Sequence, residues 1–140
     1  MNIIKCLTLT LIIVCGFVIC PRAYSVTIIT HASVGQADIP SAQLRRIFSM
    51  RQLRWQNGVA ITVFVLPSQH PLHQRFSKEK LGIFPYQLDN IWQKLSFSGL
   101  GATPIVVQTP QDLLEAVQAT PGAIGYAADE VRTGGEVDVN

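Results

Sequence analysis

A short apolar run followed by two prolines constrains the fold of this chain more than any other stretch. Residues 60–66 read AITVFVL. A β-branched apolar run of this length, bounded by turn residues, predicts a strand that is buried on both faces, as in a parallel sheet. Pro67 ends the strand because proline cannot donate to a sheet ladder. Pro71 then stands where the first turn of a helix tolerates proline. The stretch therefore predicts a strand, a short polar loop and a helix start.

The loop of this unit is the candidate ligand site. In open α/β sheets, ligands bind outside the carboxyl ends of the strands, and a helix N-terminus there offers unpaired N–H groups to anions. Ser68, Gln69 and His70 form the loop, and Arg75 lies about one turn into the helix, where its guanidinium suits a phosphate or carboxylate. We therefore predict Ser68, Gln69, His70 and Arg75 as ligand-binding residues. Two simpler interpretations stay open: Ser68 as the N-cap of the helix, and Arg75 as an ordinary surface residue.

The N-terminus has the three regions of a secretory signal peptide. Lys5 supplies the positive charge, residues 6–20 form a 15-residue apolar run, and Ala23 and Ser25 place small residues at the −3 and −1 positions of a cleavage site. The apolar run is shorter than the roughly 20 residues of a membrane span. The sequence predicts a signal peptide at residues 1–25, cleavage after Ser25, and one exported domain at residues 26–140. A retained N-terminal anchor is the alternative.

Cleavage would change the chemistry of the chain. All three cysteines lie in the leader, so the mature domain would have neither disulfide nor thiol. The leader also holds two of the 11 Lys and Arg residues and none of the nine Asp and Glu residues, so nine of each sign remain. A net charge of zero argues against a general nucleic-acid binder. The 115 residues that follow residue 25 are enough for one hydrophobic core.

Hydrophobic periodicity and turn signals place the other elements. Strands are expected at residues 26–30, 105–107 (short and buried) and 123–127, helices are expected to begin near residues 41, 85 and 110, and a weak edge strand is expected within 129–140. Thr109 before Pro110 is a typical N-cap pattern. Strands and helices alternate along the chain, which predicts an α/β fold with a mostly parallel sheet and helices on both of its faces.

Nothing in the sequence indicates catalysis. The chain has no Gly-x-Ser-x-Gly elbow, no paired carboxylates and no Gly-x-x-x-x-Gly-Lys loop, so we expect a protein that is not an enzyme and has no cofactor. His70 and His73 have a spacing that metal-ligand pairs use, and His31 follows the first strand, but zinc needs a third or fourth ligand. We expect no metal site and assign these histidines to solvent-exposed sheet ends.

Two further groups of residues have competing interpretations. Four arginines fall within ten residues and form either a docking patch for an anionic partner or membrane surface, or the solvated face of a helix and its connector: Arg45, Arg46, Arg51 and Arg54. The aromatic residues are assigned to the core, since aromatics at helical spacing pack first: Trp55, Phe76, Trp92 and Tyr126. Gly122 and Gly125 are expected to permit positive φ or close approach of the backbone.

An ordered set of motifs in this chain resembles a known family. The set consists of Leu44-x-x-Ile47-Phe48, Trp55 with Gly58, the strand at 61–65, Phe76, Trp92, Phe97-Ser98-Gly99 and TPGAIGY at 120–126. Across residues 26–126 it is similar to the small phosphate ABC transporter substrate-binding-like proteins, which have a type 2 periplasmic-binding fold. The resemblance implies an exported, non-enzymatic module that binds a small anion such as phosphate. It also implies an ABC transporter or sensor membrane component as a partner.

The chain departs from this family in two ways. Full-length members have two lobes with the ligand between them, whereas the mature length here suits one lobe, so a partner or a second copy in a homodimer would complete the open side. Full-length members also wrap phosphate with a loop resembling Arg-Ser-x-Gly-Ser-Gly-Thr. Residues 66–72 read LPSQHPL and lack the arginine, both glycines and the threonine. The alternative to anion binding is therefore an accessory protein-interaction module that keeps the fold and has lost the anion site.

Overall fold

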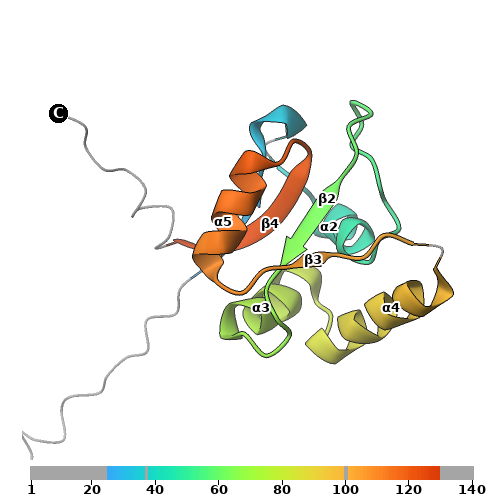
Figure 1. Ribbon diagram of the computed structural model, residues 1–140. Helices are drawn as coiled ribbons and strands as arrows, with labels where there is room; N and C mark the ends of the chain where they lie inside the picture. Colours follow the sequence, from blue (N-terminus) through green and yellow to red (C-terminus); the bar gives the residue numbers. More distant parts are fainter. Residues whose placement is uncertain (1–24, 37, 100, 130–140) are drawn as a thin grey trace, which may run out of the picture.

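The protein is described here from a computed structural model, which defines residues 25–36, 38–99 and 101–129. The predicted leader, apart from Ser25, and the predicted edge strand of the C-terminal tail lie outside the described residues. The chain forms an α/β fold around one four-stranded sheet, in the order β1-β4-β2-β3 (Figure 1). The expected α/β class is confirmed.

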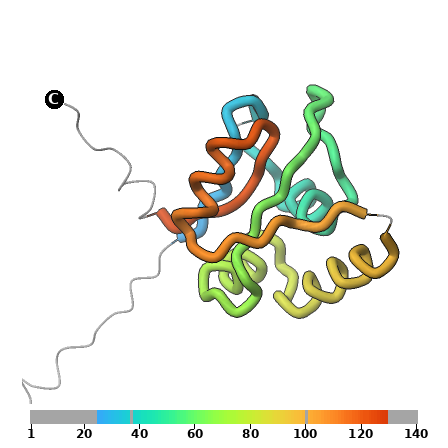
Figure 2. Tube along the Cα trace, viewed as in Figure 1, coloured from blue at the N-terminus to red at the C-terminus, as the bar shows by residue number. Residues whose placement is uncertain are grey.

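The sheet is mixed, with three of its strands parallel. β2 (Thr62–Val65) runs parallel to both of its neighbours, β3 (Ile105–Val106) and β4 (Ala123–Ala128). β1 (Val26–Thr30) is antiparallel to β4, with Val26 opposite Ala128. The first and last strands of the described chain therefore lie side by side, as the blue and red ends of the trace show in Figure 2. The alternation of strands and helices predicted the parallel strands but not the reversed direction of β1.

The helices begin where the sequence signals placed them. They are α2 (Ser41–Phe48), α3 (Pro71–Phe76), α4 (Pro85–Ser98) and α5 (Pro110–Ala119); a short 3-10 turn, η1 (Ala32–Val34), precedes α2, and a π-helical segment, η2 (Ser77–Leu81), extends α3. Thr109 Oγ1 accepts a hydrogen bond of 3.1 Å from Asp112 N–H, so the predicted N-cap of α5 is confirmed. Gly82 ends η2 in the left-handed conformation, with φ of 63°.

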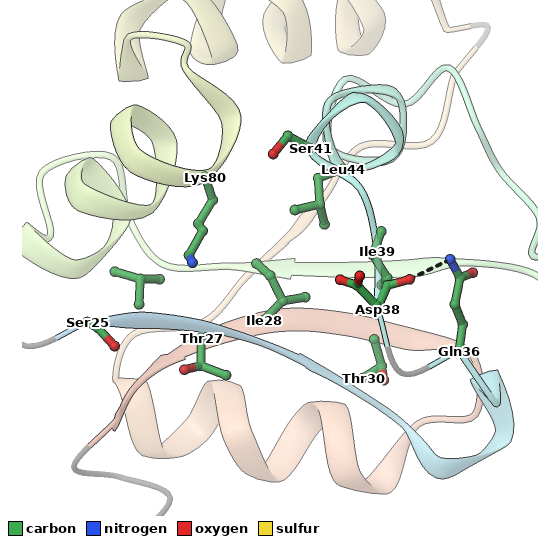
Figure 3. A pocket seen from close by; sticks show the side chains of 11 residues that line it. Ser25, Thr27, Ile28, Thr30, Gln36, Asp38, Ile39, Ser41, Leu44 and Lys80 are labelled. Carbon is green, nitrogen blue, oxygen red and sulfur yellow. Dashed lines mark hydrogen bonds between the residues drawn. The ribbon is translucent and has the colours of Figure 1, made fainter.

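Alternation along β4 directs neighbouring side chains to opposite faces of the sheet. Gly125 faces α5, because a Cβ atom placed there would lie 2.9 Å from the Val117 side chain. Tyr126 points to the other face, where its ring stacks on Phe76 of α3 at 4.0 Å and lies 6.4 Å from Phe48 of α2. Figure 3, seen along the sheet, shows α5 (pale orange) below the strands and α2 above them. Phe76 and Tyr126 are fully buried, which confirms their assignment to the core.

The segment between α2 and β2 is held by a hydrogen bond to Gly122, the residue that directly precedes β4. Trp55 is 4% exposed, and its Nε1 donates a 2.9 Å hydrogen bond to Gly122 O. Gly122 has φ of +77°, and a Cβ atom there would overlap Ala60 O. Only glycine meets both conditions, because an L side chain disfavours positive φ and has no space here. The predicted core role of Trp55 and the backbone role of Gly122 are confirmed.

Three expectations about burial are wrong. β3 was expected to be buried, but Ile105 and Val106 are 48% and 52% exposed. The reason is that β3 is an edge strand, with β2 on one side only. His73 was assigned to solvent, but it is fully buried beneath the sheet end. Trp92 of α4 was assigned to the core, but it is only half-buried and packs against the core from outside.

Candidate functional site

The predicted strand, loop and helix are present at the candidate site. β2 ends at Val65 and α3 begins at Pro71, so the loop lies at the carboxyl end of a parallel strand (Figure 1). Gln69 is exposed and Ser68 and His70 are half-buried. The loop is therefore open to solvent, as a ligand site in an α/β sheet requires.

The polar side chains of the loop have partners within the chain. His70 Nδ1 accepts a 3.1 Å hydrogen bond from Leu72 N–H, so His70 is the N-cap of α3. Ser68, considered as the N-cap from the sequence, instead donates from Oγ to Asp89 Oδ1 at 2.6 Å. Asp89 belongs to α4, 21 residues further along the chain. A carboxylate thus occupies the position next to the hydroxyl that was predicted to receive an anion.

Arg75 forms an ion pair away from the loop. Its Nε donates to Glu79 Oε1 at 3.0 Å, one helical turn toward the C-terminus. Its side chain is 35% exposed, and that of Glu79 is 45% exposed. In this arrangement the positive charge of Arg75 is balanced by Glu79 rather than directed toward Ser68.

A buried hydrogen-bonded chain lies directly beneath the loop. The Tyr126 hydroxyl accepts a 2.9 Å hydrogen bond from Leu66 N–H and lies 2.6 Å from His73 Nδ1. Because Leu66 uses an oxygen lone pair, the hydroxyl proton is available for His73 Nδ1, and we assign the imidazole proton to Nε2. Within the part of the chain that the structure describes, His73 Nε2 has no hydrogen-bond partner. These hydrogen bonds link the end of β2 to α3 and β4.

Burial sets the protonation states of this chain. Burial lowers the pKa of His73; the nearby Asp89 carboxylate raises it in part, and His70 lowers it further. Burial raises the pKa of Tyr126, against the smaller opposing effect of the hydrogen bond from Leu66. The folded protein therefore holds a neutral imidazole and a neutral phenol here, which suits a structural link between strand and helix.

A hollow of about 280 Å³ lies beside the loop, between α4 and the residues around β3. Its lining consists of Asp89, Trp92, Gln93, Ser96, Thr103, Pro104 and Val106. Asp89 therefore connects the hollow to Ser68. Asp89 was not predicted as a site residue, since nothing in the local sequence pattern of α4 signals a contact with the loop. Among the described residues, no group of three or more His, Cys, Asp or Glu side chains is arranged to hold a metal ion.

Comparison with solved structures supports a fold like that of a periplasmic binding protein. The structure is similar to the crystal structure of an ABC-type phosphate transport receptor from Vibrio cholerae, with a TM-score of 0.56 and 16% sequence identity. The similarity covers 82% of this chain and 43% of the receptor, so this chain spans less than half of that protein. No family model and no curated protein sequence matches the chain.

Across residues 25–36, 38–99 and 101–129, no helix combines the length and the apolar character that crossing a bilayer requires.

Proposed function

We propose that this chain is an exported, non-enzymatic binding module. It consists of one periplasmic-binding-protein-like lobe that acts by contact with a partner protein and no longer binds phosphate at the loop after β2. The observation that carries this proposal is the 2.6 Å hydrogen bond from Ser68 Oγ to Asp89 Oδ1.

The electrostatics of this contact disfavour an anion. A phosphate that accepts a hydrogen bond from Ser68 would lie beside the Asp89 carboxylate. Two unit charges of the same sign about 4 Å apart repel by about 4 kcal/mol at an effective dielectric constant of about 20. Since about 1.4 kcal/mol corresponds to a tenfold change, the repulsion lowers affinity by roughly three orders of magnitude. Arg75 does not offset this repulsion, because Glu79 holds its guanidinium.

The surface next to the hollow supports contact with a protein. Phe97 at the end of α4 is 90% exposed, and Val106 on β3, which lines the hollow, is 52% exposed. α4 and the β3 segment line the hollow together, and Figure 1 shows β3 passing above α4. Apolar side chains exposed around a hollow are typical of interaction sites. The partner that we propose is an ABC transporter or sensor membrane component, or a second copy in a homodimer.

A second candidate function is the binding of a small anion such as phosphate by Ser68, Gln69, His70 and Arg75. The specific observation in its favour is the open loop at a parallel strand end, in a fold that is similar to a phosphate transport receptor. Thermal unfolding with phosphate, sulfate and small carboxylates separates the two candidates. A ligand at 100 times its Kd adds about 2.7 kcal/mol to stability.

We expect no shift for the wild-type protein at millimolar anion. Asp89→Asn removes the charge and keeps an acceptor for Ser68, so it should bind anions more tightly than the wild type. Asp112→Asn, at an exposed site on α5, is the matched control. A phosphate-dependent shift in the wild type that Ser68→Ala abolishes would establish the anion site and overturn the proposal.

Partner contact is tested by a photo-activated crosslinking residue at Val106 in cells of the native host. We expect one discrete adduct, with a membrane protein or with a second copy of the chain. The same residue at Gln118, on the exposed side of α5, should give none. The absence of any adduct from position 106 would count against an interface at β3. Export is tested by the N-terminal sequence of the periplasmic protein, which should begin at Val26.

A further inference from the structure

A second hollow opens at the other end of the sheet, on the side of β1 that carries α2. Its volume is about 360 Å³, within the range of roughly 300–1,000 Å³ that small-molecule sites occupy. β1 is an edge strand, so no further strand of the described sheet covers the hollow on that side. Its walls come from β1, from the segment that leads into α2, from the first turns of α2 and from η2 (Figure 3). None of these residues belongs to the loop after β2.

Two opposite charges line this hollow without pairing. Asp38 precedes α2 and is exposed at the hollow, whereas Lys80 belongs to η2 and is half-buried. Figure 3 shows Lys80 extending toward β1 and Asp38 on the far side of Ile28. Within the described residues, neither charge forms an ion pair with the other or with any third side chain.

The remaining lining mixes hydroxyl and amide side chains with apolar ones. Ser41 is the first residue of α2, and Pro40 before it makes no side-chain hydrogen bond to the helix. Uncapped N–H groups in the first turn and the helix dipole favour a negative group there. In Figure 3, Ser41 lies on the same side as Lys80. Ile28, Ile39 and Leu44 supply apolar surface to the hollow.

We propose that this hollow binds a free α-amino acid with an apolar side chain. Lys80 and the start of α2 receive the carboxylate, Asp38 receives the ammonium group, and the apolar lining contacts the side chain. A ligand with both charges satisfies both unpaired residues at once, whereas an anion would face Asp38 and a cation would face Lys80. This inference does not rest on the proposed function, because the two sites share no residue.

The test compares ligands that differ by one charge. Isothermal titration of the full chain with L-leucine, N-acetyl-leucine and leucinamide should show binding of leucine. Loss of either ligand charge should weaken binding by about tenfold or more, the factor that corresponds to about 1.4 kcal/mol. This comparison uses the unmodified protein, so its outcome does not depend on whether a variant folds. Absence of leucine binding at millimolar concentration, or equal binding of all three compounds, would overturn the proposal.

Two variants then assign each charge to its residue. Lys80→Met should weaken leucine binding and abolish the preference for leucine over leucinamide. Asp38→Asn should weaken leucine binding and abolish the preference for leucine over N-acetyl-leucine. Lys78→Met, in the same segment but exposed and outside the hollow, is the matched control and should bind as the wild type does. Retention of both preferences in both variants would place the amino acid elsewhere and refute the assignment.

Discussion

The Tyr126 hydroxyl is the group whose removal should test the structure most directly. It accepts a hydrogen bond from Leu66 N–H and pairs with His73 Nδ1, and all three residues are at most 1% exposed. Tyr126→Phe keeps the ring, including its stacking on Phe76, and removes only the oxygen. A buried polar group left without a partner costs about 1–3 kcal/mol. With two groups affected, we expect a loss of about 3 kcal/mol of unfolding free energy.

The loss is measurable by urea and thermal denaturation. For a domain of about 100 residues, about 1 kcal/mol corresponds to about 4–8 °C in Tm, so Tyr126→Phe should lower Tm by at least about 12 °C. Tyr86→Phe is the matched control, because Tyr86 is 62% exposed, and it should change stability by less than about 0.5 kcal/mol. If Tyr126→Phe were as stable as the control, the buried hydrogen bonds beneath the loop would make no net contribution to stability.

Two further predictions concern the same core. Because burial lowers the pKa of His73, the folded protein binds fewer protons than the unfolded chain between that lowered pKa and the ordinary value of about 6.5. The free energy of unfolding should therefore fall as the pH drops through this window. His73→Gln should reduce that fall, as measured by urea denaturation at pH 7 and pH 5. An unchanged dependence of the unfolding free energy on pH would contradict the role assigned to His73. An alanine at a positive φ costs about 1–2 kcal/mol in backbone strain. Gly122→Ala should destabilise the protein by more than this, because its Cβ would also overlap Ala60 O. Gly99→Ala, at φ of +65° with open space around it, should show only the backbone cost in the same chemical denaturation, and equal losses would refute the overlap.

Local chemistry in the sequence accounts for the elements that position the site. Pro67 and Pro71 delimit the loop because proline removes a ladder donor in one place and suits a first helical turn in the other. Thr109 before Pro110 starts α5 for an equally local reason, and its cap is present in the structure. Such signals depend on a few neighbouring residues, so they can be recognised without knowledge of the tertiary fold.

The misplaced features depend on contacts between distant residues. An apolar run of three residues does not reveal whether its strand is central or at an edge, so β3 was wrongly expected to be buried. His73 lies in the first turn of α3 and was wrongly assigned to solvent, since its burial depends on a contact with Tyr126, 53 residues away. The contact between Ser68 and Asp89 spans 21 residues and two helices, and no periodicity encodes it. The strand, loop and helix at the candidate site were thus predictable, whereas the side-chain contacts of the loop were not.

The pairing of β1 with β4 has a consequence for biosynthesis. Val26 lies opposite Ala128, so the strand that is made first has its sheet neighbour among the last residues of the described chain to be synthesised. Pairings of such large sequence separation form slowly, because closing the long loop between the strands loses conformational entropy before the contact stabilises the chain. A nascent chain that has left the ribosome as far as α5 still lacks the strand that β1 needs. It must therefore stay incompletely folded until β4 has also been synthesised, 93 residues or more after the end of β1 in the sequence.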